Sequence, residues 1–321
     1  MNQKMKAMVI YEPGGPEKFV LEERAIPSVK EGWTLVKIKG FGINHSEIFT
    51  RKGLSPTVQF PRILGIECVG QVVETTRRDL QEGQKIVSIM GEMGRAYDGS
   101  YAEYVLLPNE QIYPVDSQLS WAELAAIPET YYTAFGSFKN MQIKEGDSIL
   151  VRAATSGVGL AFLKLVKAQF PQNCVVGAVR SLAKKDLLQR QGFDEIILDE
   201  RGVLQTEEKF DKILELVGPA TLKNSFDHIQ SAGIICNTGQ LGGKWYVEEF
   251  DPIVEIKNNS FLTSFYSGNV SQQLIDELFS YIDAYQINVS PQRIFSLEQI
   301  PAAHSYIESQ VGFGKVVVLN D

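Results

Sequence analysis

The sequence predicts an α/β protein in which a doubly wound parallel sheet follows a β-rich region. Its 321 residues are enough for about two domains. Before Ser120, short runs of β-branched and aromatic residues are separated by Gly and Pro, as in β structure. After Ser120, strand-like runs alternate with helical patterns, and this order favours a parallel sheet covered on both faces.

The β-rich region contains five predicted strands, at residues 7–10, 34–38, 69–74, 85–89 and 101–106. Turns such as Glu31-Gly32 and Glu82-Gly83 separate them. Few long helical patterns interrupt this region. A helix is expected at 121–127, where Ser120 can act as N-cap and Glu123 completes a capping box.

The alternating region predicts six strands, which are enough for a complete doubly wound sheet. The strands are expected at 148–152, 174–179, 195–198, 211–216, 233–237 and 261–265. Helices are expected at 157–168, 183–191 and 219–229. The tail predicts helices at 271–285 and 300–309 and strands at 293–296 and 315–319.

Charge and cysteine usage restrict the class of protein. The formal net charge of −8 argues against electrostatic binding to nucleic acid or to anionic membranes. No apolar run approaches the length needed to span a bilayer, and no apolar signal segment follows Met1. Cys68, Cys174 and Cys236 are an odd number and lie far apart, which favours a reducing, cytoplasmic setting.

A tight turn of small residues follows the strand at 148–152. In the pattern G-x-G-x-x-G, its three key positions hold Ala154, Ser156 and Gly159. Small residues there let the chain turn, let backbone amides approach a pyrophosphate, and let helix and strand pack closely. The turn therefore predicts a dinucleotide site at a helix N-terminus. An ordinary tight strand–helix turn is the alternative.

The end of the next strand indicates which dinucleotide is preferred. NAD-binding folds place Asp or Glu about 20 residues after the turn. This chain has Arg180, Ser181, Lys184 and Lys185 there and no acidic residue. Such side chains suit a 2′-phosphate, so we expect NADP(H). The alternative is that these cations merely solvate the start of a helix.

Several ordered motifs together make the chain resemble the medium-chain dehydrogenase/reductase superfamily, most closely its zinc-free quinone oxidoreductase branch. The similarity extends over essentially the whole chain, and the order and spacing of the motifs are its specific feature. The motifs are Met5-Lys6-Ala7, Pro13-Gly14-Gly15-Pro16, Gly42-Ile43-Asn44-His45-Ser46-Glu47, Leu64-Gly65-Ile66-Glu67-Cys68-Val69-Gly70, Asp98-Gly99-Ser100-Tyr101-Ala102-Glu103-Tyr104, Ala125-Ala126-Ile127-Pro128, Thr133-Ala134, the glycine turn, Leu216-Val217-Gly218 and Gly314-Lys315-Val316-Val317.

The resemblance implies a domain plan. Residues 1–123 and 268–321 would form a partly barrel-like, GroES-like catalytic domain. Residues 124–267 would form an inserted Rossmann domain that binds NADPH. The active site would lie in the cleft between them. The strand at 261–265 would pair across a two-fold axis in a homodimer.

The resemblance also implies that no metal is bound. Zinc-dependent members carry Cys where this chain has Asn44 and His where it has Ile66, and their third ligand falls near Glu129 or Thr130. Isoleucine cannot ligate a metal, and the cysteine-rich structural-zinc lobe has no counterpart here. A residual site built from His45, Glu67 and Cys68 is the alternative.

Without zinc to hold an alkoxide, electron-poor hydride acceptors become the expected substrates. We therefore expect NADPH-dependent reduction of quinones or related α,β-unsaturated carbonyls. One alternative is an alkenal or enoyl-thioester reductase, or a dehydrogenase of another alcohol. A second is an NADPH-binding regulatory or structural protein without turnover.

By resemblance, Asn44 and Tyr131 are the expected catalytic residues. The Asn44 amide could donate to a carbonyl, although a turn asparagine that satisfies backbone groups is the alternative. Phe49 stands where many quinone reductases have Tyr, so Tyr131 or Tyr132 would supply the phenol unless both only pack. His45 could relay a proton or bind backbone or phosphate.

The resemblance also implies cofactor contacts from several loops and strands, and Glu67 is expected either to orient its neighbours or to be a buried structural carboxylate. The expected cofactor-binding residues are Asn44, Thr133, Thr155, Ser156, Gly157, Val158, Gly159, Arg180, Ser181, Lys184, Val217, Gly239, Gln240, Phe261, Leu262, Thr263 and Lys315.

Overall fold

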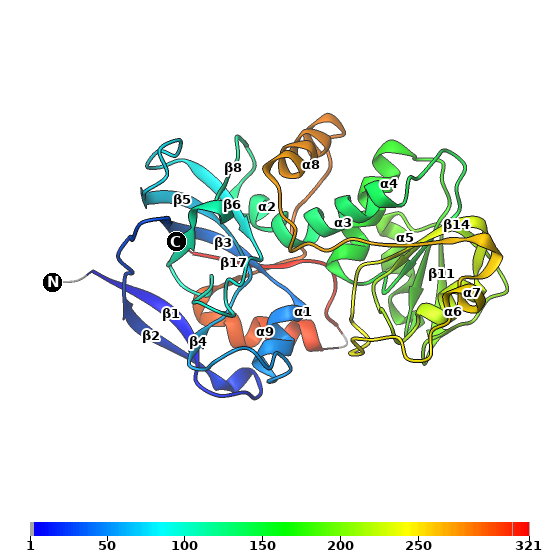
Figure 1. Cartoon of the computed structure of the whole chain (residues 1–321), viewed down its shortest axis with the longest axis horizontal. Helices are drawn as coiled ribbons and strands as arrows, with labels where there is room; N and C mark the ends of the chain where they lie inside the picture. The colour runs from blue at the N-terminus through cyan, green and yellow to red at the C-terminus, as the bar shows by residue number, and fades with distance from the viewer. Residues whose placement is uncertain (1–2, 310, 321) are drawn as a thin grey trace. The chain divides into compact units, whose positions relative to one another are not determined.

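The computed structural model describes residues 3–309 and 311–320. The chain divides into two compact units (Figure 1). Unit 1 comprises residues 1–132, 268–280 and 288–321, and unit 2 comprises residues 133–267 and 281–287. The functional domain boundaries expected from the sequence stay a proposal.

Unit 2 contains the doubly wound parallel sheet, which confirms the expected fold class. Its strand order is β12-β11-β10-β9-β13-β14-β15. Leaving out the short antiparallel β12, the order is 3-2-1-4-5-6, that of a Rossmann sheet. The strands are β9 (Ile149–Arg152), β10 (Val175–Val179), β11 (Glu195–Glu200), β12 (Val203–Leu204), β13 (Phe210–Glu215), β14 (Ile229–Asn237) and β15 (Phe261–Ser264).

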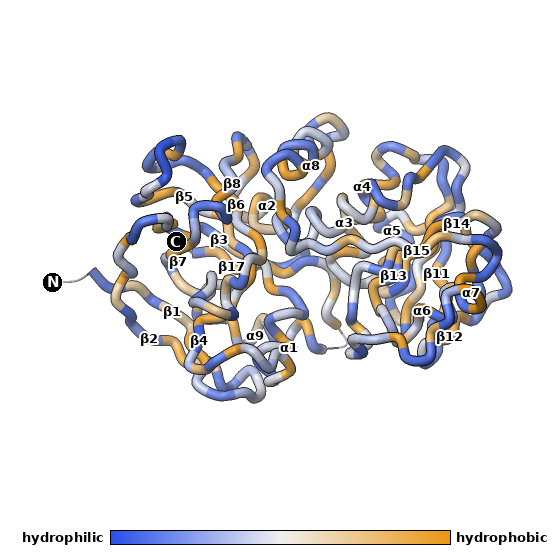
Figure 2. Tube along the Cα trace, viewed as in Figure 1, coloured by the Kyte–Doolittle hydropathy of each residue, from blue (hydrophilic) through white to orange (hydrophobic). Residues whose placement is uncertain are grey.

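Helices cover both sides of this sheet, with α4 on one side and α6 on the other (Figure 1). The central strands are apolar because both of their faces are covered (Figure 2). The helices are α3 (Pro128–Asn140, which begins in unit 1), α4 (Gly157–Gln169), α5 (Lys185–Gln191), α6 (Leu222–Asp227) and α7 (Pro252–Glu255).

The structure corrects the expected helix at 219–229 and strand at 233–237. Helix α6 ends at Asp227, and β14 begins at Ile229. The strand begins early because the fully buried Ile229 pairs with Phe210 across an irregularity in the register. Burial of Ile229 beside β13 therefore overrides the helical pattern of this segment.

Unit 1 is β-rich, as expected for a GroES-like domain. One sheet has the order β16-β17-β3-β5-β6-β8, with β7 also paired to β3, and a second has the order β2-β1-β4. The first sheet contains β3 (Trp33–Ile43), β5 (Glu67–Thr75), β6 (Lys85–Ile89), β7 (Tyr104–Pro108), β8 (Tyr113–Pro114), β16 (Arg293–Ser296) and β17 (Val316–Leu319). The second contains β1 (Lys4–Ile10), β2 (Phe19–Ala25) and β4 (Arg62–Ile63).

The tail returns to unit 1 and completes its larger sheet. Strand β17 pairs antiparallel with β3, so Val316 lies opposite Ile43. This register brings the residue before β17, Lys315, beside the end of β3. The helices of the unit are α1 (His45–Arg51), α2 (Trp121–Ala125), most of α8 (Gln272–Ala284) and α9 (Ile300–Glu308).

Candidate functional site

The small-residue turn of unit 2 lies between β9 and α4, as its sequence predicts. Ala154 is fully buried, and the Ser156 side chain caps α4 by accepting a hydrogen bond from the Gly159 N–H at 3.1 Å. A Cβ on Gly159 would lie 3.0 Å from the Ala153 carbonyl oxygen, an unusually tight contact, so glycine suits the close approach of α4 to the turn. Gly157 and Val158 belong to the first helical turn, whose N–H groups have no carbonyl partner within the helix. This arrangement fits an anionic group.

The end of β10 presents cationic and hydroxyl side chains. Arg180 and Ser181 are exposed, and Ser181 Oγ accepts a hydrogen bond from the Ala183 N–H at 3.3 Å. Lys184 is half-buried, and this burial lowers its pKa. The residues expected to recognise a 2′-phosphate therefore follow one another directly after the strand. Their role in binding stays a prediction.

A second pair of turns lies at the ends of β13 and β14. The Glu215 carbonyl accepts hydrogen bonds from the N–H groups of Thr238 and Gly239, at 3.0 and 3.2 Å. The Gly242 N–H donates to the Val217 carbonyl at 2.8 Å. Val217 and Gly239 thus belong to interlocked turns at the carboxyl edge of the sheet, while Gln240 is exposed. Ligands of doubly wound sheets bind at this edge.

Unit 1 contains a buried polar cluster around Asn44, which we call the Asn44 cluster and which comprises Asn44, Glu47, Glu67 and Lys315. Lys315 Nζ donates to Asn44 Oδ1 at 2.8 Å and to Glu67 Oε1 at 2.6 Å. Asn44 Nδ2 donates to Glu67 Oε1 at 2.8 Å. These bonds fix the orientation of the Asn44 amide, with Oδ1 accepting from Lys315 and Nδ2 donating to Glu67. Lys315 and Glu67 are 7% and 0% exposed, so this ion pair is buried.

Glycine at position 42 makes room for the ion pair. A Cβ on Gly42 would lie 2.2 Å from Lys315 Nζ and 2.3 Å from Glu67 Oε1. Any larger residue would push the two side chains apart. The second Glu67 oxygen accepts a hydrogen bond from the Glu129 N–H at 2.8 Å, so Glu67 also anchors the start of α3.

Glu47 is the second acidic residue of the Asn44 cluster. Its carboxyl accepts from the Asn44 N–H at 3.2 Å and from the Ile66 N–H at 3.4 Å. Burial raises the pKa of Glu47 to about 8, and the nearby Glu67 charge adds to the rise. Glu47 is therefore mostly protonated at neutral pH, and Lys315 and Glu67 form a balanced pair.

Comparison with known proteins matches two family models to separate parts of the chain. The model described as "Alcohol dehydrogenase GroES-like domain" matches residues 30–117, and that described as "Zinc-binding dehydrogenase" matches residues 191–318. The quinone oxidoreductase of Sus scrofa is 23% identical over 332 residues, which cover 98% of each chain. The chain belongs to the medium-chain dehydrogenase/reductase superfamily. The resemblance stated from the sequence motifs is therefore confirmed.

Other members of the superfamily show the same extent of similarity. A 2-haloacrylate reductase from Burkholderia is 25% identical over 343 residues and covers 98% of each chain. The quinone oxidoreductase structure from Coxiella burnetii has a TM-score of 0.85 at 22% identity and covers 99% of this chain and all of that one. A mycobacterial structure in complex with NADPH has a TM-score of 0.82 at 22% identity and covers 98% of this chain and all of that one. At these identities the structures establish the fold.

At the two positions where the resemblance places zinc ligands, this chain has Asn44 and Ile66. Ile66 offers no ligand atom, and Asn44 is hydrogen-bonded to Lys315 and Glu67. Within residues 3–309 and 311–320, no group of three His, Cys, Asp or Glu side chains could hold a metal ion. His45 is exposed, whereas Cys68 is fully buried with a raised pKa caused by its burial. His45, Glu67 and Cys68 thus do not form the residual site considered above.

The tyrosines near the expected active site are engaged by backbone groups. Tyr131 is buried on α3, and its hydroxyl donates to the Asn288 carbonyl at a long 3.5 Å. The Tyr132 hydroxyl donates to the Asn269 carbonyl at 3.0 Å and accepts from the Ser271 N–H at 3.1 Å. Burial raises the pKa of both phenols. The catalytic role of Tyr131 stays a prediction.

The remaining expected cofactor residues lie in unit 2. Thr133 is buried on α3, and its carbonyl accepts a hydrogen bond from Ser137 Oγ at 2.8 Å. Thr155 is half-buried in the turn before α4. Phe261, Leu262 and Thr263 lie on β15 and pair in parallel with β14. Phe261 is 58% exposed and Leu262 is 38% exposed.

Sequence reasoning missed two charged residues of unit 2, Arg152 and Glu215, both fully buried at the carboxyl ends of strands. The signal was present, because an arginine ends the apolar run Ile149-Leu150-Val151 directly before the small-residue turn. A charge in a buried strand requires partners. Those partners come from distant parts of the chain, which no local pattern indicates.

Proposed function

We propose that the protein is an NADP(H)-dependent reductase of quinones or related α,β-unsaturated carbonyls, and that it works without zinc. The observation that carries the proposal is the Asn44 cluster, in which the Lys315 ammonium supplies the positive charge beside Asn44 and Glu67. Membership of an oxidoreductase superfamily, with quinone and 2-haloacrylate reductases among the relatives, supports this class of reaction.

The chemistry of the donor set argues against zinc as part of this proposal. Zinc prefers Cys, His and carboxylate ligands in a tetrahedral arrangement. At the family positions this chain offers an amide and a hydrocarbon, and the nearby Glu67 carboxylate is already paired with an ammonium. A cation added there would have to displace Lys315 from two hydrogen bonds.

The turn before α4 and the end of β10 fit a phosphorylated dinucleotide. Ser156 caps the helix, the first helical N–H groups would face a bound anion, and Gly159 suits the close approach of the helix to the turn. Arg180, Ser181 and Lys184 would hold the 2′-phosphate. When bound, the nicotinamide ring supplies a hydride to the acceptor.

The residues of this chain would orient the acceptor and stabilise the charge that develops on its oxygen. Asn44 Nδ2 carries two hydrogens. Glu67 Oε1 accepts one of them at 2.8 Å, and the other makes only a long 3.5 Å contact with Glu47 Oε1, which a substrate could replace. The other would donate to a substrate carbonyl, whose oxygen becomes negative as hydride reaches the conjugated carbon. Lys315 and Glu67 hold the amide in the donating orientation. Tyr131 is proposed to line the pocket.

Chelation and a panel of acceptors test the proposal. NADPH oxidation with a simple quinone should continue unchanged after exhaustive treatment with a chelator and gel filtration. Loss of turnover that returns with Zn²⁺ would refute zinc independence. A panel of quinones, alkenals, enoyl thioesters and alcohols would identify the substrate class. Tight NADPH binding with no acceleration by any acceptor would favour a binding protein instead.

We also propose a cytoplasmic homodimer that pairs through β15. In the described part of the chain, β15 ends the sheet, with β14 as its partner strand. Its exposed Phe261 and Leu262 would be covered by a second copy, which would also protect the strand edge.

None of the described helices is long and apolar enough to cross a bilayer. Cys68 and Cys236 are buried free thiols, and Cys174 is an exposed one, which favours a reducing compartment.

A further inference from the structure

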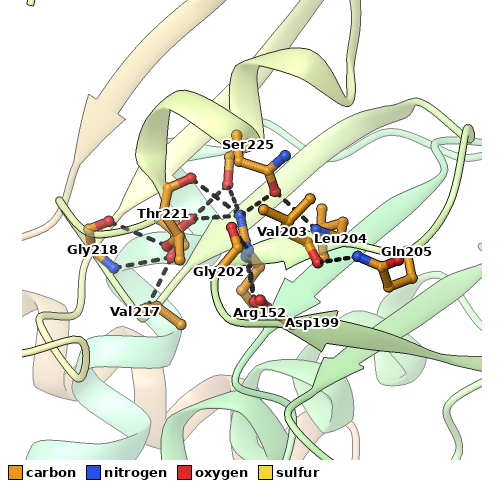
Figure 3. A network of polar contacts seen from close by, with 12 residues as sticks. Arg152, Asp199, Gly202, Val203, Leu204, Gln205, Val217, Gly218, Thr221 and Ser225 are labelled. Carbon is orange, nitrogen blue, oxygen red and sulfur yellow. Dashed lines mark hydrogen bonds and ion pairs between the residues drawn. The ribbon is translucent and has the colours of Figure 1, made fainter.

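Arg152 is the centre of a buried polar network at the carboxyl edge of the unit 2 sheet (Figure 3). It is the last residue of β9 and is fully buried. Its Nε and Nη2 atoms donate to Asp199 Oδ2 at 3.1 and 2.6 Å. Its Nη1 atom donates to the Thr221 carbonyl at 3.1 Å and to Ser225 Oγ at 3.0 Å. One guanidinium thus joins the ends of β9 and β11 to α6.

The connection from β11 to β13 explains why this space needs a polar side chain. Residues 201–209, all of them described, contain β12 and no helix, although the connection crosses to the other side of β9. Crossovers of this type usually carry a helix that packs on the sheet. Here Arg152 Nη2 donates to the Gly202 carbonyl at 3.1 Å and ties the short connection to β9. Asn224 Oδ1 accepts from Arg152 Nη1 at 3.2 Å and from the Leu204 N–H at 3.0 Å.

Glu215 connects the Arg152 network to the turn after β13. Its Oε1 atom accepts hydrogen bonds from the N–H groups of Val217 and Gly218, at 2.9 and 3.0 Å. Its Oε2 atom accepts from Ser225 Oγ at 2.5 Å and lies 3.7 Å from Arg152 Nη1. The carboxylate therefore holds two successive backbone groups of this turn. Its own position depends on α6 and on the Arg152 charge.

The network also reaches the strand beside Arg180. Val179 and Leu198 are paired in the parallel register of β10 and β11, so Arg180, directly after β10, and Asp199, on β11, are the next residues of the two segments. Asp199 is 5% exposed, and its Oδ1 atom has no hydrogen-bond partner among the described residues. Without Arg152, the Asp199 and Glu215 carboxylates would leave two negative charges beneath the edge proposed to receive phosphate groups. Such charges would oppose anion binding.

We infer that Arg152 is a positioning residue for the dinucleotide, which acts through Glu215 on the Val217–Gly218 turn and through Asp199 on the end of β11. The inference rests on the proposed use of this edge for NADP(H). It assigns Arg152 no contact with the ligand. Arg152 holds two binding segments in place and neutralises acidic residues beneath them.

Replacing Arg152 by Met in the full chain tests the inference. Met keeps an unbranched, flexible side chain of the length of the arginine stem and removes its charge and all five donors. The nucleotide-free variant should exchange the Val217 and Gly218 amide hydrogens faster by about tenfold or more, measured by hydrogen-exchange mass spectrometry. The Kd for NADPH should rise by about tenfold or more, while kcat at saturating NADPH changes little.

Asp211→Ala is the matched control. Asp211 lies near the start of β13, at the opposite end of the sheet from Arg152, and its Oδ2 atom accepts from the Ser148 N–H and Oγ at 2.8 and 2.7 Å. This variant should lose stability without changing the Kd for NADPH or the exchange of Val217 and Gly218. Should Arg152→Met fail to fold, Arg152→Lys keeps one positive charge but loses the forked geometry, and the same two shifts are expected.

The outcomes separate this inference from the proposed function. A folded Arg152 variant with the wild-type Kd and wild-type exchange would show that Arg152 only stabilises the fold, and the proposed function would stand. A wild-type protein that binds neither NADPH nor NADH would refute the proposed function and this inference with it. Wild-type binding without turnover would refute the proposed reaction, whereas a raised Kd in the variant would still support the positioning role.

Discussion

Replacement of Lys315 by Met should strongly destabilise unit 1. Lys315 Nζ lies 2.6 Å from Glu67 Oε1, and its loss leaves a fully buried carboxylate with the Glu129 N–H and Asn44 Nδ2 as donors. Removing one partner of a buried ion pair costs about 3–5 kcal/mol. A unit of this size loses about 2–4 °C per kcal/mol, so Tm should fall by about 6–20 °C.

Calorimetry and urea unfolding of Lys315→Met, of Glu67→Gln and of the double variant measure this coupling. The double variant should recover part of the stability, because it buries no unpaired charge. Lys4→Met is the control, since Lys4 pairs with Glu23 at 2.8 Å on the exposed surface, where solvent screens the pair and its loss should change the free energy of unfolding little. If Lys315→Met loses no more stability than Lys4→Met, the ion pair does not stabilise the site.

Three further predictions follow from the same features. Burial, with the Glu67 charge, raises the pKa of Glu47 to about 8 from 4.5, so the folded state keeps a proton that the unfolded chain releases. Between about pH 5 and 8, the free energy of unfolding of the wild type should therefore fall, relative to that of Glu47→Gln, by up to about 1.4 kcal/mol per pH unit. Equal pH dependence of the two proteins in urea unfolding would contradict this. Arg180→Ala combined with Lys184→Ala should raise the KM for NADPH far more than that for NADH, whereas equal effects would show that these side chains do not recognise the phosphate. Phe261→Lys on β15 should give a monomer in light scattering, while Ile253→Lys, at a 92% exposed position on α7, should leave the assembly unchanged; a dimer that survives Phe261→Lys would exclude this interface.

Local patterns predicted the elements well, because each depends on residues close together in sequence. The Ser120–Glu123 capping box and the start of α4 directly after the small-residue turn are examples that the structure confirms. The boundary between α6 and β14 was wrong because the pairing of Ile229 with Phe210 decides it. The partners of Lys315 were also beyond prediction from the sequence, since Glu67 lies 248 residues away and the two come together only because β17 and β5 both pair with β3.

Lys315 and Arg152 both balance the charge of buried carboxylates, but they do so with different sets of partners. In the Asn44 cluster, the raised pKa of Glu47 leaves that carboxyl protonated, so Lys315 balances Glu67 and the cluster is neutral near pH 7. A neutral cluster would not oppose the negative charge that the proposed hydride transfer would place on an acceptor oxygen beside Asn44. In unit 2, Arg152 faces both Asp199 and Glu215, and the Val217 and Gly218 N–H groups supply additional positive dipoles to Glu215. Those dipoles come from the very turn that the carboxylate positions. The charge balance of the sheet edge and the geometry of its turn are therefore set by the same contacts, so a change at Arg152 must alter both.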